Sequence, residues 1–259
     1  MAVQIGTSGW QYDDWRGAFY PESLRRADWL GHYARRFATV EVNNTFYRLP
    51  DPERFASWAE QTPDDFVLTL KASRFLTHVK RLKEPAEPVG RLLEHAKPLQ
   101  RKLGPVLLQL PPSFQADLDR LDATLRAFPD SVRVAVEPRH DSWFADEARA
   151  LLGEHDAALC LADRDSRLLT PAWATASWGF VRFHAGRASP HPCYGTHALN
   201  SRAGLVAELW PVGAEVFCYF NNDQHCCAVR DARWFAAACR RHGLAPTRVP
   251  DAGEVQLAT

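Results

Sequence analysis

Eight short apolar runs recur along the 259-residue sequence, and most of them precede a segment with helical periodicity. A strand followed by a helix, repeated about eight times, predicts a parallel sheet covered by helices. Eight such units in roughly 250 residues favour a closed TIM-type (β/α)8 barrel over an open doubly wound sheet. We therefore predict one α/β barrel domain over residues 1–259. The runs lie at residues 3–8, 39–43, 66–71, 106–110, 131–143, 157–162, 179–184 and 215–221.

Helices are expected between most of these runs because apolar residues recur there every three or four positions. Ser23 and Asp51-Pro52 are typical helix starts, and Gly243 is a typical helix end. The sixth unit is different: residues 163–177 read mostly as loop, so the sixth helix is predicted to be short or missing. The helices are expected at about residues 23–37, 51–59, 89–99, 118–128, 141–151, 199–209 and 228–242.

The composition argues against several classes of protein. The chain is 46% hydrophobic and 24% charged, which is ordinary for a globular protein. It carries 31 basic and 31 acidic residues, so its net charge of zero makes nucleic-acid binding unlikely on electrostatic grounds. No apolar stretch reaches the roughly 20 residues of a membrane span. We expect a small-molecule substrate and no membrane partner, and no pattern indicates an oligomeric state.

Six cysteines raise the question of disulfides. The sequence contains no C-x-x-C motif and does not open with a signal-peptide pattern. We therefore expect reduced thiols in a cytoplasmic protein. The cysteines are Cys160, Cys193, Cys218, Cys226, Cys227 and Cys239.

The run at residues 131–143 indicates where chemistry is expected. Its valines alternate with other residues up to Glu137, which is typical of a strand with two different faces. In a barrel the apolar valine face packs against helices, so Glu137 is predicted to point inward. Arg139 and His140 follow at once. Either this carboxylate is functional, or it forms a structural ion pair with Arg139.

The other strands repeat this pattern. Their inward positions turn polar at the C-terminal end, although buried charges cost several kcal/mol unless they are paired or solvated. Barrel enzymes place their active sites at that end, so we predict an active site there. The alternative is a plug of structural ion pairs. The inward polar residues are Glu41, Asn43, Lys71, Gln109, Glu137, Arg182, His184, Tyr219 and Asn221, with Asp163 just past the sixth strand.

The same segments resemble a known family. The motifs are GTSGW at 6–10, VEVNNTFYRLP at 40–50, LGPVLLQLPPSF at 103–114, VEPRHDSW at 136–143, RFH at 182–184 and YFNND at 219–223. In this order the chain resembles the DUF72 (YecE-like) family over nearly its whole length. The resemblance implies a TIM-type barrel. It implies no reaction, because the family is uncharacterised.

The predicted catalytic residues are two carboxylates and two histidines. Glu41 and Glu137 would perform general acid–base chemistry across the pocket. His140 and His184 are the histidines best placed for proton transfer. The predicted function is an enzyme, of lyase, isomerase or hydrolase type, for a small polar anionic or sugar-like substrate. Structural ion pairs and hydrogen-bonded histidines are the alternatives.

The predicted substrate-binding residues are cationic, amide and aromatic. Lys71 with Arg182 would hold an anion, or Lys71 would act as a Schiff-base nucleophile. The amides would recognise hydroxyl or carbonyl groups, and the aromatic rings would stack on sugars or bases. The remaining candidates of this set are Trp10, Asn43, Gln109, Arg139, Tyr219 and Asn221.

Two other functions stay open at this point. The aromatic rim could bind a nucleotide or a single-stranded nucleic acid without catalysis. Alternatively, Glu41, Glu137, Asp163 and His184 form an oxygen and nitrogen set that suits a divalent metal of an isomerase or hydrolase. The sequence has no compact metal-ligand spacing, so we assign no metal ligand and no cofactor.

Overall fold

The strands of the protein form two mainly parallel sheets. The structure is a computed structural model that describes residues 1–257. One sheet has the order β11-β1-β10-β9-β7-β8 and the other the order β2-β3-β4-β5-β6. Only the β7–β8 pairing is antiparallel in the described sheets. The strands are β1 (Ala2–Thr7), β2 (Thr39–Val42), β3 (Val67–Lys71), β4 (Leu103–Gln109), β5 (Val134–Glu137), β6 (Ala158–Leu159), β7 (Leu161–Arg164), β8 (Arg167–Leu168), β9 (Gly179–Ala185), β10 (Glu215–Phe220) and β11 (Ala245–Pro246).

The two sheets meet at two places. A single parallel bridge, between Ser8 and Glu41, joins the end of β1 to β2. At the other meeting point β6 belongs to one sheet and β7 to the other, with only Cys160 between them in the chain. Within residues 1–257 the ladders therefore do not form one continuous ring. The fold is mixed α/β with parallel strands, and the closed barrel stays a prediction.

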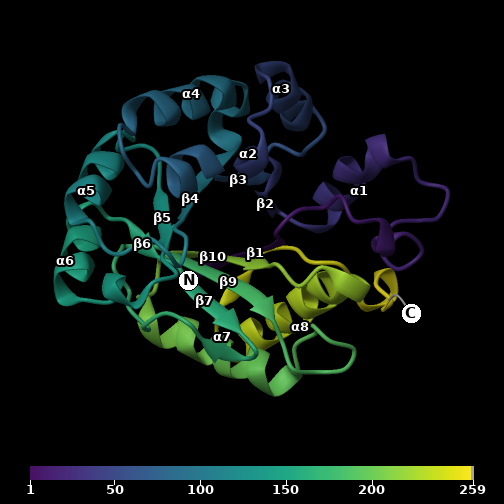
Figure 1. The fold of residues 1–259 in the computed structure, drawn as a ribbon. Helices are drawn as coiled ribbons and strands as arrows, with labels where there is room; N and C mark the ends of the chain where they lie inside the picture. The colour runs from purple at the N-terminus through teal and green to yellow at the C-terminus, as the bar shows by residue number, and fades with distance from the viewer. Residues whose placement is uncertain (258–259) are drawn as a thin grey trace.

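The helices lie outside the strands (Figure 1). Between β7 and β9 the described chain has only the β7–β8 hairpin and a loop, in agreement with the prediction for the sixth unit. Two helices start later than predicted, at Trp29 and Asp146, because short 3-10 turns precede them. The helices are α1 (Trp29–Arg36), α2 (Asn44–Tyr47), α3 (Pro52–Glu60), α4 (Ala86–Ala96), α5 (Leu118–Arg126), α6 (Asp146–Glu154), α7 (Thr196–Leu209) and α8 (Cys227–Arg241).

No helix among residues 1–257 is both long and apolar enough to cross a membrane. Short helical turns complete the described elements. One of these turns is a π-helical segment, and the others are 3-10 turns. They are η1 (Asp13–Trp15), η2 (Arg26–Asp28), η3 (Phe75–Val79, the π segment), η4 (Lys97–Lys102), η5 (Asp141–Trp143), η6 (Gln224–Cys226) and η7 (Ala252–Glu254).

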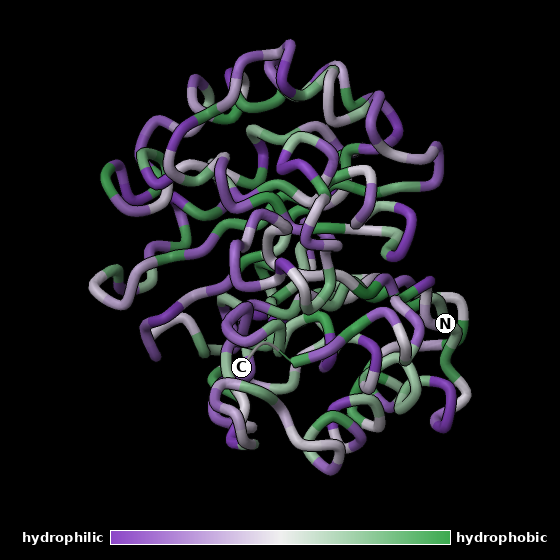
Figure 2. The backbone as a smooth tube through the Cα atoms, turned by 90° about the vertical axis from the view of Figure 1, so that its right-hand side faces the viewer, coloured by the Kyte–Doolittle hydropathy of each residue, from purple (hydrophilic) through white to green (hydrophobic). Residues whose placement is uncertain are grey.

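Two groups of apolar side chains form the core, and hydrophobic stretches of the chain run through the interior (Figure 2). The larger group lies between strands and helices. The smaller group comes from the opposite strand faces, as the alternation predicts. Its members are Leu107, Ala135, Ala158, Cys160, Trp178, Phe180, Phe217 and Tyr219.

Tyr219 fixes this inner group between the sheets. Its hydroxyl lies 2.7 Å from the hydroxyls of Thr39 on β2 and of Thr69 on β3, while Tyr219 itself belongs to β10. A cavity of about 530 Å³ opens at the N-terminal ends of the strands, where Val67, Gly104 and Phe217 line it. The inner group thus separates that cavity from the C-terminal end of the strands.

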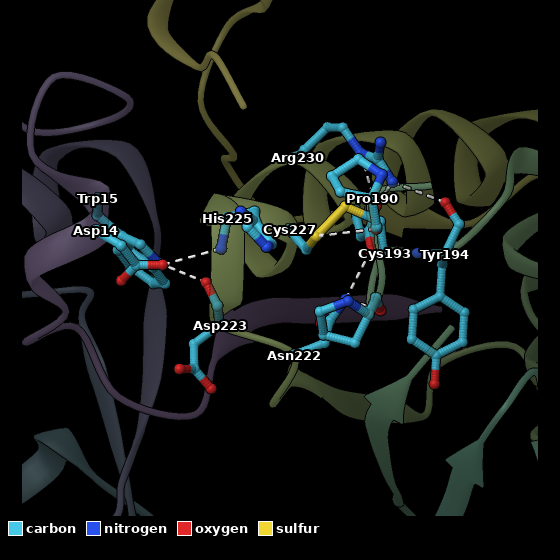
Figure 3. Close-up of a disulfide and its surroundings, with 12 residues drawn as sticks. Asp14, Trp15, Pro190, Cys193, Tyr194, Asn222, Asp223, His225, Cys227 and Arg230 are labelled. Atoms are coloured by element: carbon cyan, nitrogen blue, oxygen red, sulfur yellow. Dashed lines mark hydrogen bonds and ion pairs between the residues drawn. A yellow bond between two sulfur atoms is a disulfide. The ribbon is translucent and has the colours of Figure 1, made fainter. Parts of the chain in front are cut away.

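One disulfide contradicts the prediction of six reduced thiols. Cys193 and Cys227 are bonded, while the other four cysteines are free and buried. The bond attaches the loop after β9 to the start of α8 (Figure 3). The partners are 34 positions apart in sequence. Only the folding of the two βα loops onto each other brings them together, so their spacing carried no signal.

The close approach of β1 to β2 depends on Gly6. A Cβ atom at this position would lie 2.3 Å from the backbone oxygen of Thr39. We expect Gly6→Ala to lower the free energy of unfolding by about 1–3 kcal/mol through overpacking. Gly90, in the middle of α4, is the matched control because a methyl group added there would meet no atom within 4 Å apart from its chain neighbours and the nearby helix backbone. Gly90→Ala should stabilise by about 0.5–1 kcal/mol. Urea denaturation measures both, and equal effects would contradict this account of the junction.

The disulfide predicts a thiol count. Denatured protein prepared without reductant should react with a thiol reagent at four cysteines, and at six after reduction. Replacing the pair, as Cys193→Ser with Cys227→Ser, should cost about 3–4 kcal/mol of stability, given the loop that the bond closes. Six reactive thiols in the unreduced protein would show that the bond does not form.

Candidate functional site

Arg182 links the two sheets at the C-terminal ends of their strands. It comes from β9, and its guanidinium donates to Glu137 of β5 at 2.6 Å and to Glu41 of β2 at 2.7 Å. All three residues are at most 1% exposed. A buried charge needs such partners, because the loss of hydration costs several kcal/mol per ion. The three predicted residues therefore do meet at one end of the strands.

Glu137 also contacts Arg139 and His184, which are more exposed than Arg182. The region at the C-terminal ends of the strands around these two residues and Lys71 is called the mouth. Oε1 of Glu137 pairs closely with Arg139 and lies 2.9 Å from Nε2 of His184. On the other side of the imidazole, Asn221 Nδ2 lies 3.3 Å from Nδ1. Arg139 Nη2 is also 2.9 Å from His184 Nε2. Both ring nitrogens of His184 are thus engaged by neighbouring residues.

The charges of this network are fixed near neutral pH. Burial by itself raises the pKa of Glu137, but Arg182, His184 and Arg139 outweigh it and hold that pKa well below the usual range. Burial lowers the pKa of His184. Glu137 is therefore a carboxylate and His184 is neutral at pH 7. This favours a positioning role for Glu137 over the predicted role as a proton donor.

Lys71 has no such partner. It ends β3, it is 9% exposed, and its Nζ lies 4.3 Å from the ring centre of Phe46. In the part of the chain that the structure describes, its ammonium makes no hydrogen bond or ion pair. Burial, followed by the proximity of Arg182, lowers the pKa of Lys71 to about 8. With Arg139 and Arg182 against two glutamates, Lys71 leaves the cluster with one excess positive charge.

Further polar groups at this end of the strands are incompletely bonded. Gln109 lies beside Glu137 in the β4–β5 ladder, is half-buried, and makes no side-chain hydrogen bond within residues 1–257. Asn43 donates to the Ser8 carbonyl at 3.1 Å, while its Oδ1 has no partner. Oε2 of Glu41 is also unpartnered among the described residues. The mouth therefore has spare hydrogen-bonding capacity beside the excess cation.

Three predicted residues do not belong to this mouth. Trp10 is 4% exposed and packs edge-on against Trp58 at 5.5 Å, so it offers no stacking surface. Tyr219 is fully buried in the inner core, which rules out direct contact with a ligand at the rim. His140 uses Nδ1 to accept from the backbone of Ser142 and makes no described contact with the network. Tyr219 does face inward as predicted, but it lies below the rim. Trp10 and His140 lie outside the strands, where no periodicity indicates the direction of a side chain.

The predicted metal set is not assembled. Asp163 lies within β7 opposite Phe183, on the helix-facing parity, where it pairs with Arg202 at 2.6 Å and accepts from Tyr194 at 2.8 Å. Placing it past the strand end was wrong. Among residues 1–257 no group of three or more His, Cys, Asp or Glu side chains is arranged to hold a metal ion. Arg182 lies between the two glutamates that such a site would use.

Phe46 was not among the predicted substrate-binding residues. The structure makes it the ring that covers Lys71, because α2 (Asn44–Tyr47) turns directly after β2. Strands β2 and β3 are neighbours, and Glu41 lies beside Thr69 in their register. Two positions further along each strand, Asn43 therefore lies close to Lys71, and α2 with Phe46 follows Asn43 directly. This pairing of β2 with β3 was the signal that could have placed Phe46 near Lys71.

Comparison with known proteins places the chain in a family context. A family model described as "Protein of unknown function DUF72" matches residues 4–254. The UPF0759 protein YecE of Escherichia coli (strain K12) is 32% identical over 169 residues, which cover 64% of this chain and 60% of the relative. The UPF0759 protein YunF of Bacillus subtilis is 27% identical over 152 residues, which cover 55% and 52%. The match thus spans little more than half the length of these relatives.

Two solved structures share the fold. A DUF72 family protein from Thermotoga maritima, TM1631, has a TM-score of 0.80 at 28% identity and covers 93% of this chain and 100% of that one. A DUF72 family protein from Enterococcus faecalis, EF0366, has a TM-score of 0.77 at 20% identity over 92% and 95%. The second likeness speaks for the fold alone.

The Arg182 network makes a prediction for stability. Arg182→Met leaves Glu41 and Glu137 as buried carboxylates without their shared cation, so we expect a loss of about 3–5 kcal/mol at pH 7. The depressed pKa of Glu137 stabilises the native state above the unfolded glutamate pKa of about 4.3, and this contribution is lost as the pH falls through the folded pKa. Glu137 protonates more readily in the variant, which lacks Arg182, so the stability deficit of the variant should shrink in acid.

Arg126 provides the matched control. It forms an exposed pair with Asp122 within α5, and exposed pairs contribute little. Arg126→Met should leave the urea midpoint unchanged. A deficit in Arg182→Met that does not depend on pH would mean that lost packing, not unpaired charge, causes it.

Proposed function

Since this chain belongs to the DUF72 family of proteins of unknown function, we propose its function from the geometry of its mouth: it is an enzyme that binds a small polar, anionic or sugar-like substrate at the C-terminal ends of its strands. The observation that carries the proposal is the ammonium of Lys71. The residue is only 9% exposed, its ammonium is unpaired within the described chain, and the neighbouring arginines and glutamates are paired with one another.

Electrostatics supports an anionic ligand. The excess positive charge lies where the surroundings have a low dielectric constant, and there a charge attracts its counter-ion more strongly than it does in water. Arg139 is a second cation at this place. Its side chain is 14% exposed and is held in position by its partner Glu137. A carboxylate or phosphate would complete the charge balance, and the amides of Gln109 and Asn43 would receive hydroxyl or carbonyl groups.

The geometry divides the proposed roles of the two glutamates. Both oxygens of Glu137 are engaged, by Arg182 and by the pair of Arg139 and His184, so it orients the cations. One oxygen of Glu41 is bound to Arg182 and the other is unpartnered within residues 1–257. We therefore assign proton transfer to Glu41 before Glu137. His184 would relay a proton only after releasing one of its present partners.

We also infer that the two sheets form the wall of one (β/α)8 barrel in a single domain. The support is the inner apolar group between the sheets together with the Ser8–Glu41 bridge and the continuity of β6 into β7. A cytoplasmic location stays a prediction from sequence. The disulfide weighs against it, because reducing compartments keep thiols reduced.

Anion binding tests the proposed function. Calorimetric titration at low salt with oxalate and inorganic phosphate should detect binding to the wild type. Lys71→Met should weaken it by about 10–100-fold, the equivalent of one lost charge-assisted hydrogen bond. Binding to the wild type should weaken as the pH rises through about 8, because the ammonium of Lys71 then loses its proton.

Lys80 provides the control. Its ammonium is paired with Glu84 at 2.7 Å and makes no described contact with the network. Lys80→Met should bind both anions like the wild type. If neither anion bound to the wild type, or if both variants bound them equally well, the mouth would not be an anion site.

A further inference from the structure

The chain contains five lysines, all within the described residues, and they are in different environments. Lys83 and Lys97 are exposed, and half-buried Lys80 is paired with Glu84. Lys102 is 8% exposed, but its ammonium donates to the carbonyls of Ala59 and Thr62 at 2.6 and 2.7 Å. Lys71 alone combines burial with an amine that has neither a carbonyl nor a carboxylate partner. Of the two buried lysines, Lys71 is thus the one whose amine is not held by such bonds.

From this contrast we propose that Lys71 is a covalent nucleophile, which forms an imine with a small carbonyl compound that carries an acidic group next to the carbonyl, as in a 2-oxo acid. The inference rests on the proposed function of the mouth and names its substrate class. It assigns Lys71 a reacting role in addition to the attraction of the anion.

The bond changes balance without a redox partner. The neutral Nζ attacks the carbonyl carbon, and the π electrons of the C=O bond move to the oxygen. Nitrogen then loses a proton, the oxygen gains one, and a carbinolamine results. Expulsion of the oxygen as water, with one further proton taken up, leaves a protonated C=N bond between the substrate and Lys71. Hydrolysis reverses these steps.

A nearby carboxylate can exchange these protons. Glu41 lies opposite Thr69 in the β2–β3 ladder, and Lys71 is two residues further along β3 on the same inward face. Neighbouring strands are about 4.8 Å apart and two residues span about 6.6 Å. The long lysine side chain and a substrate bound to it fit this interval. Oε2 of Glu41 is the oxygen with no partner among the described residues.

The substrate class follows from the charges around the amine. A 2-oxo acid has its carboxylate one bond from the carbonyl carbon, so the two groups can contact Arg139 and Lys71 together. Phe46 lies over the amine at 4.3 Å and limits access by bulky groups. A neutral ketone would lack the attraction to the excess positive charge, and a phosphate without a carbonyl would bind without reacting.

The protonation state of Lys71 gives the reaction a pH signature. Burial lowers the pKa of Lys71 to about 8, so about a quarter of its amine is neutral at pH 7.5. A lysine of ordinary pKa, near 10.4, is neutral to about one part in a thousand there. Imine formation at Lys71 should therefore rise to half its maximum near pH 8, well before surface lysines react.

Reductive trapping with pyruvate tests the inference. The full-length protein is incubated with pyruvate and cyanoborohydride, and intact and peptide masses are measured. We expect one adduct, equal to pyruvate less one oxygen atom, on Lys71, at least about tenfold above any other lysine at pH 7.5. Acetone, which lacks the acidic group, should label Lys71 at least about tenfold less.

Two variants complete the experiment. Lys71→Arg keeps the positive charge without a nucleophilic amine, so it should lose the adduct and still bind oxalate. Lys80→Arg should be labelled on Lys71 like the wild type. Even if Lys71→Arg did not fold, the site of labelling in the wild type would decide the question.

The outcomes separate this inference from the proposed function. Labelling spread over exposed lysines, or no labelling at all, would overturn the imine. If the wild type then still bound oxalate, the anion site would stand and only the covalent step would fall. If it neither bound oxalate nor formed the adduct, both would fail.

Discussion

A guanidinium buried between two carboxylates determines the arrangement of the mouth. Arg182 belongs to one sheet, while Glu41 and Glu137 belong to the other, so these hydrogen bonds tie the sheets together where hydrogen-bond ladders do not. Removing any one of the three charges would leave the others in a medium that solvates ions poorly. The network also fixes side-chain directions: Glu137 can hold Arg139 and His184 because Arg182 has already fixed its other oxygen.

This satisfied network accounts for the unusual state of Lys71. A second cation beside Arg182 has no carboxylate of its own. Glu137 is fully engaged, and no hydrogen bond or ion pair joins Lys71 to Glu41 among the described residues. Burial and the neighbouring arginine both favour the neutral amine. An unpaired cation in such surroundings costs stability, and an anionic ligand would relieve that cost. Perturbed groups of this kind are characteristic of functional sites, and Lys71 combines a lowered pKa with the lack of a charged partner.

Strand periodicity explains how much of this was predictable. Because side chains alternate across a strand, the apolar parity of each run identified Glu41, Lys71, Glu137 and Arg182 as inward residues at one end. Asp163 was misplaced because it was taken to follow its strand, whereas it belongs to β7 and has the outward parity. Trp10 and His140 lie in loops, whose side-chain directions have no such period. The disulfide joins two loops whose contact depends on the completed fold.

The hydrogen bonds of Tyr219 to Thr39 and Thr69, together with the apolar residues around them, close the interior below the charged network. The 530 Å³ cavity at the opposite end of the strands lies beyond this floor. A substrate of the proposed site at Lys71 would therefore have to leave through the opening by which it entered, and its product would have to clear that opening before the next substrate molecule could bind.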